Sequence, residues 1–246
     1  MHAIILAAVV GRRLNQGQPL PKCLLEFGGM TLLERHCRNL AACGVDNLTV
    51  VVGHESAQIA SVLAGMTRPR PLLHYNPLYT LGSSVSLWSA RHTLLCGDDV
   101  LVMDADVLYH PAILRRLIES PLRNCYLMDC DFVPGDEPVK LCVADRRIVE
   151  FRKIVAAGLH FDQIGESVGF FKFDATTALL LARLIDAYVA DGRSAQPHEE
   201  ALRDLALNPD INIGVEDVSG LPWLEIDFPE DLIRAEQQVL PLIHER

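Results

Sequence analysis

Short apolar runs alternate with longer amphipathic segments through the first half of the sequence, and this alternation limits the folds that the chain can adopt. The apolar runs, predicted as strands, lie at 3–8, 48–53, 71–75, 99–104 and 124–129. Segments with apolar residues three and four positions apart, predicted as helices, lie between them at 31–43, 55–64, 84–95 and 111–119. The pattern predicts an α/β fold with a doubly wound, mostly parallel, Rossmann-like sheet covered by helices on both faces.

The regular alternation of predicted strands and helices changes after residue 130. Two strand-like runs, 138–144 and 147–153, are separated by Asp145 and Arg146, which favours a β-hairpin. The remaining elements are predicted as strands at 166–173, 211–217 and 223–227, and as helices at 175–190, at 198–207 and from 229. Because no repeat or flexible linker interrupts the chain, we expect a single domain, 1–246, in which the hairpin adds a lid-like region.

Composition excludes some classes of function. The net charge of -10 argues against non-specific binding of nucleic acid, which needs a broad basic surface. An odd set of seven scattered cysteines, without a CxxC pair, favours reduced thiols in the cytoplasm and no zinc site. We also expect no signal peptide and no membrane span, because the first strand begins at once and no apolar run approaches about 20 residues.

The first strand runs into a loop that is rich in cations. The stretch AIILAAVVGRRL places Gly11, Arg12 and Arg13 directly after the apolar run, and Lys22 follows Pro21. A glycine turn after a strand lets backbone N–H groups approach phosphate oxygens, which the cations then neutralise. The loop has neither the Walker A pattern nor GxGxxG, and by itself it is equally typical of an ordinary surface loop.

Two pairs of carboxylates stand at the ends of predicted strands. Asp104 and Asp106 follow the run VLVM, and Glu225 and Asp227 repeat the same spacing of two near the C-terminus. In extended chain such a pair shares one face, and carboxylate oxygens suit Mg²⁺. The alternative interpretation of Asp106 is that it caps the following helix. Glu230 and Asp231 are assigned to a helix start instead, because they follow Pro229.

The order of these motifs resembles a known family. AIILAAVVGRRL, PLPKCLLEFGGMTLLER, MDAD, GESVGFFKF and EIDFPEDLIRAE follow one another as in the nucleotidyltransferases of the MobA-like or sugar-phosphate type. The resemblance covers nearly the whole chain. It is strongest to cytidylyltransferases that act on phosphocholine, inositol 1-phosphate and aminoalkylphosphonates.

The resemblance implies roles for particular residues. In the first half, 1–130, which would bind the nucleotide, Arg13 and Lys22 would hold the triphosphate and Lys22 would stabilise charge at the α-phosphorus. Asp106 would bind Mg²⁺ with help from Asp104, and Glu225 and Asp227 would complete the metal site. The remaining positions that the resemblance assigns to nucleotide binding, including candidate base contacts, are Leu6, Ala7, Ala8, Gly11, Gly82, Ser83, Ser84 and Asp104.

One position departs from the family pattern. The first glycine of the signature LAAGxGxRL is Val9 in this chain. A β-branched residue has fewer backbone conformations than glycine close to the phosphates. Either the loop has a compatible geometry without that glycine, or nucleotide binding is weaker.

The second half, 131–246, would bind the acceptor. Lys140 and Lys153 are candidate contacts of its phosphate and equally typical of exposed strand lysines. A quaternary ammonium would favour aromatic faces, and a primary amine would favour carboxylates. The aromatic candidates, which are also ordinary core residues, are Tyr75, Tyr79 and Trp88, and the acidic candidates are Asp129, Asp131, Glu166 and Glu199. His198 is interpreted as a helix start, not a metal ligand.

The sequence thus predicts an enzyme that transfers CMP from CTP to a small phospho-alcohol or phosphonate, with Mg²⁺ as cofactor and pyrophosphate as product. Lys22, Arg13 and Asp106 would be its catalytic residues. A sugar-1-phosphate uridylyl- or guanylyltransferase is the alternative enzyme. A non-catalytic nucleotide-binding or sensing protein is the alternative of another class, and a Rossmann dehydrogenase is disfavoured by the missing glycine fingerprint. The oligomeric state is not predicted.

Overall fold

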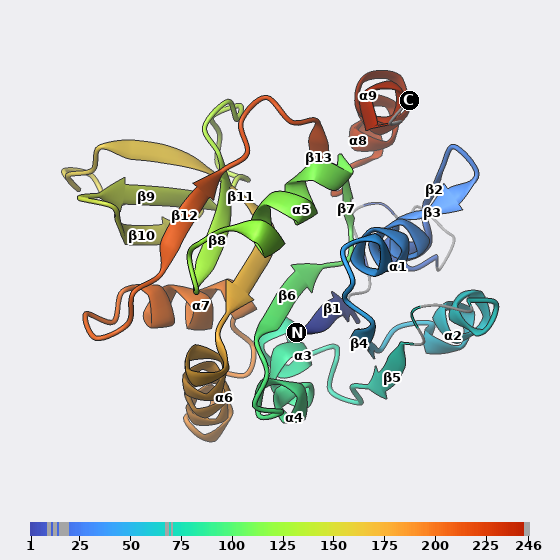
Figure 1. Cartoon of the computed structure of the whole chain (residues 1–246), viewed down its shortest axis with the longest axis horizontal. Coiled ribbons are helices and arrows are strands. Elements are labelled where there is room, and N and C mark those ends of the chain that lie inside the picture. The colour runs from blue at the N-terminus through green and yellow to red at the C-terminus, as the bar shows by residue number, and fades with distance from the viewer. Residues whose placement is uncertain (9–10, 12–13, 15–19, 67–68, 70, 244–246) are drawn as a thin grey trace.

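A nine-stranded sheet runs through the molecule (Figure 1). The computed structural model describes residues 1–8, 11, 14, 20–66, 69 and 71–243. Neighbouring strands follow the order β10-β9-β11-β6-β1-β4-β5, and β8 pairs with β11 and β12. The strands are β1 (His2–Ala7), β4 (Asn47–Val52), β5 (Leu72–Tyr75), β6 (Val100–Asp104), β8 (Cys125–Asp129), β9 (Lys140–Ala144), β10 (Arg147–Arg152), β11 (Gln163–Phe173) and β12 (Gly214–Asp217).

The first-half strands β6, β1, β4 and β5 are parallel neighbours. Their register places Leu6 beside Asp104 on one side and Val51 on the other. Parallel strands end at the same edge of a sheet, so the loops after β1, β4 and β6 meet there. This edge carries the predicted phosphate loop and the first acidic pair.

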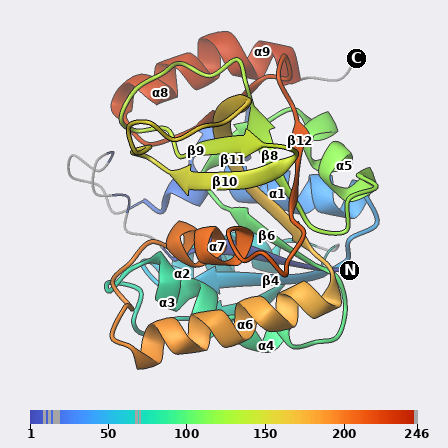
Figure 2. The ribbon, with the colours of Figure 1, turned by 90° about the vertical axis from the view of Figure 1, so that its left-hand side faces the viewer.

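Both faces of the parallel region are buried, because residues of β1 alternate between two cores. Ile4 and Leu6 belong to a core under α3, α4, α6 and α7, whereas Ala3 and Ile5 belong to a core under α1, α2 and α5. Figure 2 shows α6 and α7 side by side below the sheet. These helices are α1 (Leu32–Ala42), α2 (Ser56–Ala64), α3 (Ser83–Ser89), α4 (Arg91–Leu94), α5 (Pro111–Glu119), α6 (Ala175–Ala190) and α7 (His198–Ala206).

Local sequence signals fix several of the helix starts. Thr31 and Glu34 form a capping box at the start of α1. The Asp174 side chain accepts a hydrogen bond from the backbone N–H of Thr177 and caps α6. Pro111 occupies the first turn of α5, where its missing N–H has no cost.

Strands β9, β10 and β11 extend the sheet in antiparallel fashion, whereas β12 pairs parallel with β8. β11 pairs antiparallel with β6, β8 and β9. β9 and β10 form the predicted hairpin, and both turn residues, Asp145 and Arg146, have positive φ. The predicted α/β class and the added hairpin are therefore confirmed.

A smaller layer lies beside the large sheet near the C-terminus (Figure 1). There β13 pairs with β7 and places Glu225 opposite Val107, so the chain segment of the late acids lies next to that of the early acids. Phe27, Leu108 and Ile226 are buried in a third apolar cluster beneath it. Its elements, with the short β-ribbon next to them, are β2 (Glu26–Phe27), β3 (Met30–Thr31), β7 (Val107–Tyr109), β13 (Trp223–Glu225), α8 (Pro229–Arg234), a π-helical turn (Ala235–Val239) and α9 (Leu240–Ile243).

Two predicted boundaries were wrong. The helix expected over 84–95 is two helices, because Ala90 between them has non-helical dihedral angles. The strand expected over 211–217 begins at Gly214, since only its last four residues pair with β8. The other predicted strands and helices of the described residues lie within three residues of their observed bounds.

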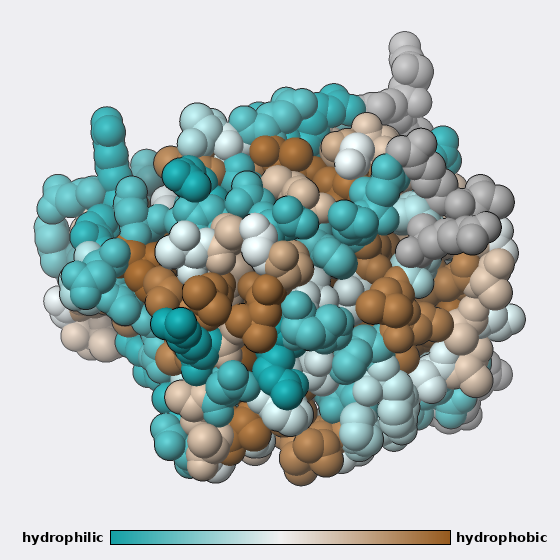
Figure 3. Space-filling model, turned by 60° about the horizontal axis from the view of Figure 1, so that its bottom comes forward, coloured by the Kyte–Doolittle hydropathy of each residue, from teal (hydrophilic) through white to brown (hydrophobic). Residues whose placement is uncertain are grey.

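β5 forms one open edge of the large sheet and exposes apolar side chains. Leu72 is 57% exposed and Tyr75 is 55% exposed. Seen from below, the surface shows apolar patches separated by polar side chains (Figure 3). Among the described residues, no helix has the length and apolarity that crossing a membrane requires.

Gly169 lets β11 pass close to the end of β6. The β11–β8 register shifts between Ser167 and Phe171, and Gly169 within this irregularity has a φ of +78°. A Cβ at Gly169 would overlap the carboxylate of Asp104. Only glycine therefore combines this backbone conformation with the observed place of Asp104.

We predict that Gly169→Ala lowers the free energy of unfolding by about 3 kcal/mol, because a strained left-handed residue and an overpacked contact add together. Gly158→Ala is the matched control, since Gly158 has a φ of +83° and nothing within 4 Å of an added Cβ. The control should cost only about 1–2 kcal/mol in urea unfolding. Equal losses for the two variants would show that the contact with Asp104 does not matter.

Candidate active site

Lys22 joins acidic residues that are far apart in the sequence. Its Nζ donates hydrogen bonds to Asp106, at 3.0 Å, and to Asp227. The Lys22 side chain is 12% exposed. Burial by itself would lower the pKa of Lys22, but the two carboxylates outweigh burial, so its pKa is raised and the ammonium stays charged.

Glu225 completes a group of three carboxylates that suits a metal ion. One oxygen from each of Asp106, Glu225 and Asp227 lies within 4.8 Å of the other two. Crowding by the surrounding protein and by the three neighbouring acids, Asp106, Asp227 and Asp104, raises the pKa of Glu225 above its usual value, although the residue is still exposed at the surface. Hard oxygen donors crowded in this way fit Mg²⁺, because a divalent cation removes their mutual repulsion. The three residues predicted as metal ligands are thus brought together.

Asp104 belongs to a second buried cluster that the sequence did not reveal. His198 Nε2 lies 3.5 Å from Asp104 Oδ1, and His198 Nδ1 lies 3.1 Å from Glu199 Oε2. Only 3% of His198 is exposed. Burial raises the pKa of Asp104 to about 7, although His198 opposes the shift. Among the described residues, His198 is the cation that lies against Asp104.

His198 and Glu199 have opposite pKa shifts. Burial alone would lower the pKa of His198, but Glu199 and Asp104 raise it to about 9. Burial alone would raise the pKa of Glu199, but His198 lowers it to about 2. The pair is therefore ionised at neutral pH. The helix start predicted at His198 is confirmed, and its side chain also forms this cluster.

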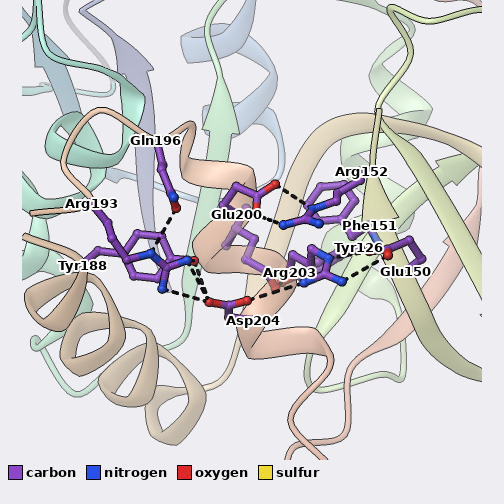
Figure 4. A network of polar contacts seen from close by, with 11 residues as sticks. Tyr126, Glu150, Phe151, Arg152, Tyr188, Arg193, Gln196, Glu200, Arg203 and Asp204 are labelled. Atoms are coloured by element: carbon purple, nitrogen blue, oxygen red, sulfur yellow. Dashed lines mark hydrogen bonds and ion pairs between the residues drawn. The ribbon is translucent and has the colours of Figure 1, made fainter. Parts of the chain in front are cut away.

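The helix that presents His198 is anchored on its other side by charged contacts (Figure 4). Arg203 of α7 pairs with Glu150 of β10 through both carboxylate oxygens. Asp204 accepts a hydrogen bond of 2.6 Å from the Tyr188 hydroxyl of α6. Because α7 is tied to both β10 and α6, its first turn is held in place beside β6.

Two cavities adjoin the acidic cluster. The smaller, about 190 Å³, is lined by Lys22, Asp104, His198 and Glu199 together with Leu6, Ala7, Cys23, Ser83, Ser86, Ala105 and Asp106. The larger, about 340 Å³, is lined by acidic, aromatic and aliphatic side chains together with the basic Arg234. Glu225 and Asp227 line both cavities. The candidate metal ligands therefore stand between two spaces that can each hold a small molecule.

Several residues predicted for nucleotide binding lie around the smaller cavity. Leu6, Ala7 and Ser83 line it directly. Gly11 has a φ of +60°, and an added Cβ there would lie 3.0 Å from Cγ of Lys22. The structure thus places the lysine stem beside this glycine. Arg13, Arg12 and Val9 lie outside the described residues.

The other three predicted nucleotide contacts lie behind the cavity wall. The Ser84 side chain is buried, and its hydroxyl has no hydrogen-bond partner among the described residues. Gly82 packs closely against the backbone of Ser194 and Ala195. The Ala8 carbonyl accepts a hydrogen bond of 3.3 Å from the backbone N–H of His54.

The predicted acceptor contacts are dispersed. Glu166 lines the larger cavity. Withdrawal from water and the neighbouring Asp129 raise the pKa of Glu166 to about 7. Lys140 donates hydrogen bonds to the carbonyls of Gly135, at 2.6 Å, and Lys153, at 2.5 Å. Neither lysine lines either of the two cavities.

The three aromatic candidates, Tyr75, Tyr79 and Trp88, line neither of the two cavities. The Trp88 indole donates a hydrogen bond of 2.8 Å to Asp186 and packs under Arg91. It lines a separate hollow near β5. Tyr79 packs against Gly53 and the His54 ring. The positions of Trp88 and Tyr79 do not support the predicted contact with an acceptor, because both side chains belong to the packing around α3 and β4.

The comparison with known families agrees with the motifs. A model of the MobA-like NTP transferase domain matches residues 3–149. The chain belongs to this family. The predicted resemblance is therefore confirmed at the level of family and fold.

Relatives with known names cover most of this chain. It is 30% identical over 242 residues to the bifunctional IPC transferase and DIPP synthase of Rubrobacter xylanophilus, covering 97% of this chain and 52% of the relative. It is 28% identical over 251 residues to the CMP-5'-(3-aminopropyl)phosphonate synthase of Streptomyces rubellomurinus, covering 98% of this chain and 39% of the relative. The chain thus spans about half or less of these two proteins. A shorter relative, 2-aminoethylphosphonate cytidylyltransferase of Lancefieldella rimae, is 26% identical over 245 residues, which cover 94% of this chain and 90% of the relative.

Solved structures share the fold. The inositol-1-phosphate CTP transferase from T. maritima has a TM-score of 0.78 and 20% identity, covering 98% of this chain and 94% of that one. The CTP:phosphocholine cytidylyltransferase from Streptococcus pneumoniae has a TM-score of 0.78 and 22% identity, covering 96% of this chain and 97% of that one. At these identities the likeness is one of architecture.

We predict that His198→Gln destabilises the protein most at pH 6 and least above pH 9. A histidine whose pKa is raised on folding stabilises fully below its unfolded-state value of about 6.5. That stabilisation is lost as the pH rises through about 9. The expected loss at pH 6 is about 3 kcal/mol, because Glu199, which is ionised at this pH, loses its buried cation.

The measurement is the free energy of unfolding at pH 6 and pH 10 for the wild type, His198→Gln and the control His160→Gln. His160 is exposed, so the control should match the wild type at both values. A loss in His198→Gln that is equal at pH 6 and pH 10 would reduce His198 to a packing residue.

Proposed function

We propose that this chain transfers CMP from CTP to a phosphate or phosphonate oxygen of a small phospho-alcohol or phosphonate. The observation that carries the proposal is the place of Lys22, Asp106, Glu225 and Asp227, at the carboxyl edge of the parallel strands and between two adjoining cavities. Transfer needs two anionic substrates that meet at one phosphorus. Two cavities that share two of the carboxylates suit that requirement.

The smaller cavity is the proposed site of the triphosphate. It lies at the end of β1, next to the glycine turn, and contains the ammonium of Lys22. A backbone turn of this kind brings N–H groups to phosphate oxygens, and a lysine neutralises the charge that develops at the reacting phosphorus. Arg13 is proposed to act with Lys22, as the family signature implies.

Asp106, Glu225 and Asp227 are proposed to hold Mg²⁺. Bound there, the ion would supply charge neutralisation and orientation for the triphosphate. The three ligands come from the end of β6 and the end of β13, two segments joined by the β7–β13 pairing. The metal site is therefore assembled only when both halves of the chain fold together.

The acceptor is proposed to occupy the larger cavity. Glu166 and Asp129 face one another across β11 and β8 on its wall, and Trp223 donates a hydrogen bond of 2.7 Å to Asp129. An acceptor phosphate or phosphonate is already an anion at neutral pH, so its oxygen needs no general base. This oxygen attacks the α-phosphorus of CTP, the bond from the α-phosphorus to the bridging oxygen breaks, and pyrophosphate leaves with the electron pair.

The choice of CTP and of this acceptor class rests on the relatives. Two of them are named for cytidylyl transfer to, or CMP attachment on, aminoalkylphosphonates. Two proteins whose solved structures share the fold are named for CTP transfer to inositol 1-phosphate and phosphocholine. In this proposal the acid-rich wall of the larger cavity faces the amino or ammonium end of an aminoalkylphosphonate or phosphocholine, and the anionic end of the acceptor faces the Mg²⁺ site.

The test is pyrophosphate release with Mg²⁺, using CTP, UTP, GTP and ATP against 2-aminoethylphosphonate, phosphocholine, inositol 1-phosphate and glucose 1-phosphate. We expect turnover with CTP and one of the first three acceptors. Lys22→Ala and Asp106→Ala should each lower kcat by about 10²–10³-fold, because each removes a preorganised charge from the reacting centre. Arg123→Ala, at a residue whose side chain is 80% exposed, is the control.

Two results would count against the proposal. Turnover only with UTP or GTP and glucose 1-phosphate would identify a sugar-nucleotide enzyme of the same fold. No turnover with any pair, in a protein that still binds CTP, would identify a nucleotide-binding protein without catalysis.

A further inference from the structure

Lys22 lies where it opposes the binding of a metal ion. Its ammonium contacts Asp106 and Asp227, which are two of the three proposed metal ligands. Both ion pairs are largely shielded from water, with side-chain exposures of 12%, 20% and 25% for the lysine and its two partners. In this arrangement the lysine already neutralises part of the negative charge that would attract a divalent cation.

The ammonium and a metal ion compete for the same oxygens. The ligand oxygens of the three carboxylates lie within 4.8 Å of one another, so there is one small space between them. Mg²⁺ binds oxygen at about 2.0–2.1 Å, and an ammonium bonded to the same carboxylates would be only a few ångströms away. Like charges at that separation repel strongly where water is partly excluded. The two cations are therefore alternative partners of Asp106 and Asp227.

A triphosphate offers Lys22 another partner. The stem of Lys22 runs past Gly11, and its side chain lines the smaller cavity. Lysine carries its charge on a flexible chain of four carbons. The ammonium can therefore leave the carboxylates and pair with phosphate oxygens in that cavity through side-chain rotation alone.

We propose that Lys22 closes the metal site in the nucleotide-free protein, and that the triphosphate opens it by drawing the ammonium away. The proposal rests on the metal ligands assigned above and adds an order of events. Divalent cation and nucleotide bind cooperatively, and free Mg²⁺ binds weakly until a triphosphate is present. By linkage, the cation strengthens nucleotide binding by the same factor.

The test is a titration of the nucleotide-free chain 1–246 with Mn²⁺, in which electron paramagnetic resonance measures the free ion. We expect Lys22→Met to bind Mn²⁺ at least tenfold more tightly than the wild type, because the competing charge is gone. Arg123→Met removes one positive charge far from the cluster, beside Asp174, and should bind Mn²⁺ as the wild type does. Lys22→Met/Asp106→Asn should lose the gain.

Three results would overturn the proposal: equal Mn²⁺ affinity in Lys22→Met and the wild type, an equal gain in Arg123→Met, or a gain that survives Asp106→Asn. Thermal melting of each variant without metal confirms that it is folded, and Lys22→Gln replaces Lys22→Met if the latter is not. The readout is metal binding and not turnover. A failure of CMP transfer in the assay with CTP would leave this result intact, so the two proposals fail separately.

Discussion

The ion pairs of Lys22 with Asp106 and Asp227 are the interaction on which the rest of the site depends. Asp104, Asp106, Glu225 and Asp227 lie close enough together to repel one another, as the raised pKa of Glu225 records. Such a group is stable only when cations accompany it. Lys22 comes from the first half of the chain. The cavity beside Lys22 leaves room for substrates that bring further charge.

Two separate cations divide the acidic region into two parts. Lys22 faces the candidate metal ligands, whereas His198 faces Asp104, and both line the smaller cavity. Lys22 carries its charge at the end of a long, rotatable side chain, whereas His198 is held by burial and by the anchoring of α7 through Arg203 (Figure 4). In our proposal the Lys22 ammonium changes partners when an anionic ligand enters, whereas His198 stays in the cavity wall.

Local patterns predicted the sheet, the hairpin at Asp145 and the convergence of the acidic pairs, because apolar periodicity and strand ends are encoded in neighbouring residues. The contact of His198 with Asp104 could not be predicted in this way. The contact depends on how α7 packs against β6. Its one sign is the unusual burial of the charged residues that begin this helix. Trp88 shows the opposite case, since the sequence offered it as an acceptor contact, but its indole lies away from both cavities and donates a hydrogen bond to Asp186. Docking of helices, unlike strand order, leaves little trace in sequence.

The central claim is that Lys22, Asp106, Glu225 and Asp227 form a metal–triphosphate site. A crystal structure with Mn²⁺ and a non-hydrolysable CTP analogue tests it most directly. We predict an anomalous scattering peak within about 2.0–2.3 Å of oxygens from Asp106, Glu225 and Asp227. The Lys22 ammonium should then contact phosphate oxygens and no longer bridge Asp106 and Asp227. A peak away from these carboxylates, or a nucleotide bound while Lys22 keeps both ion pairs, would contradict the account.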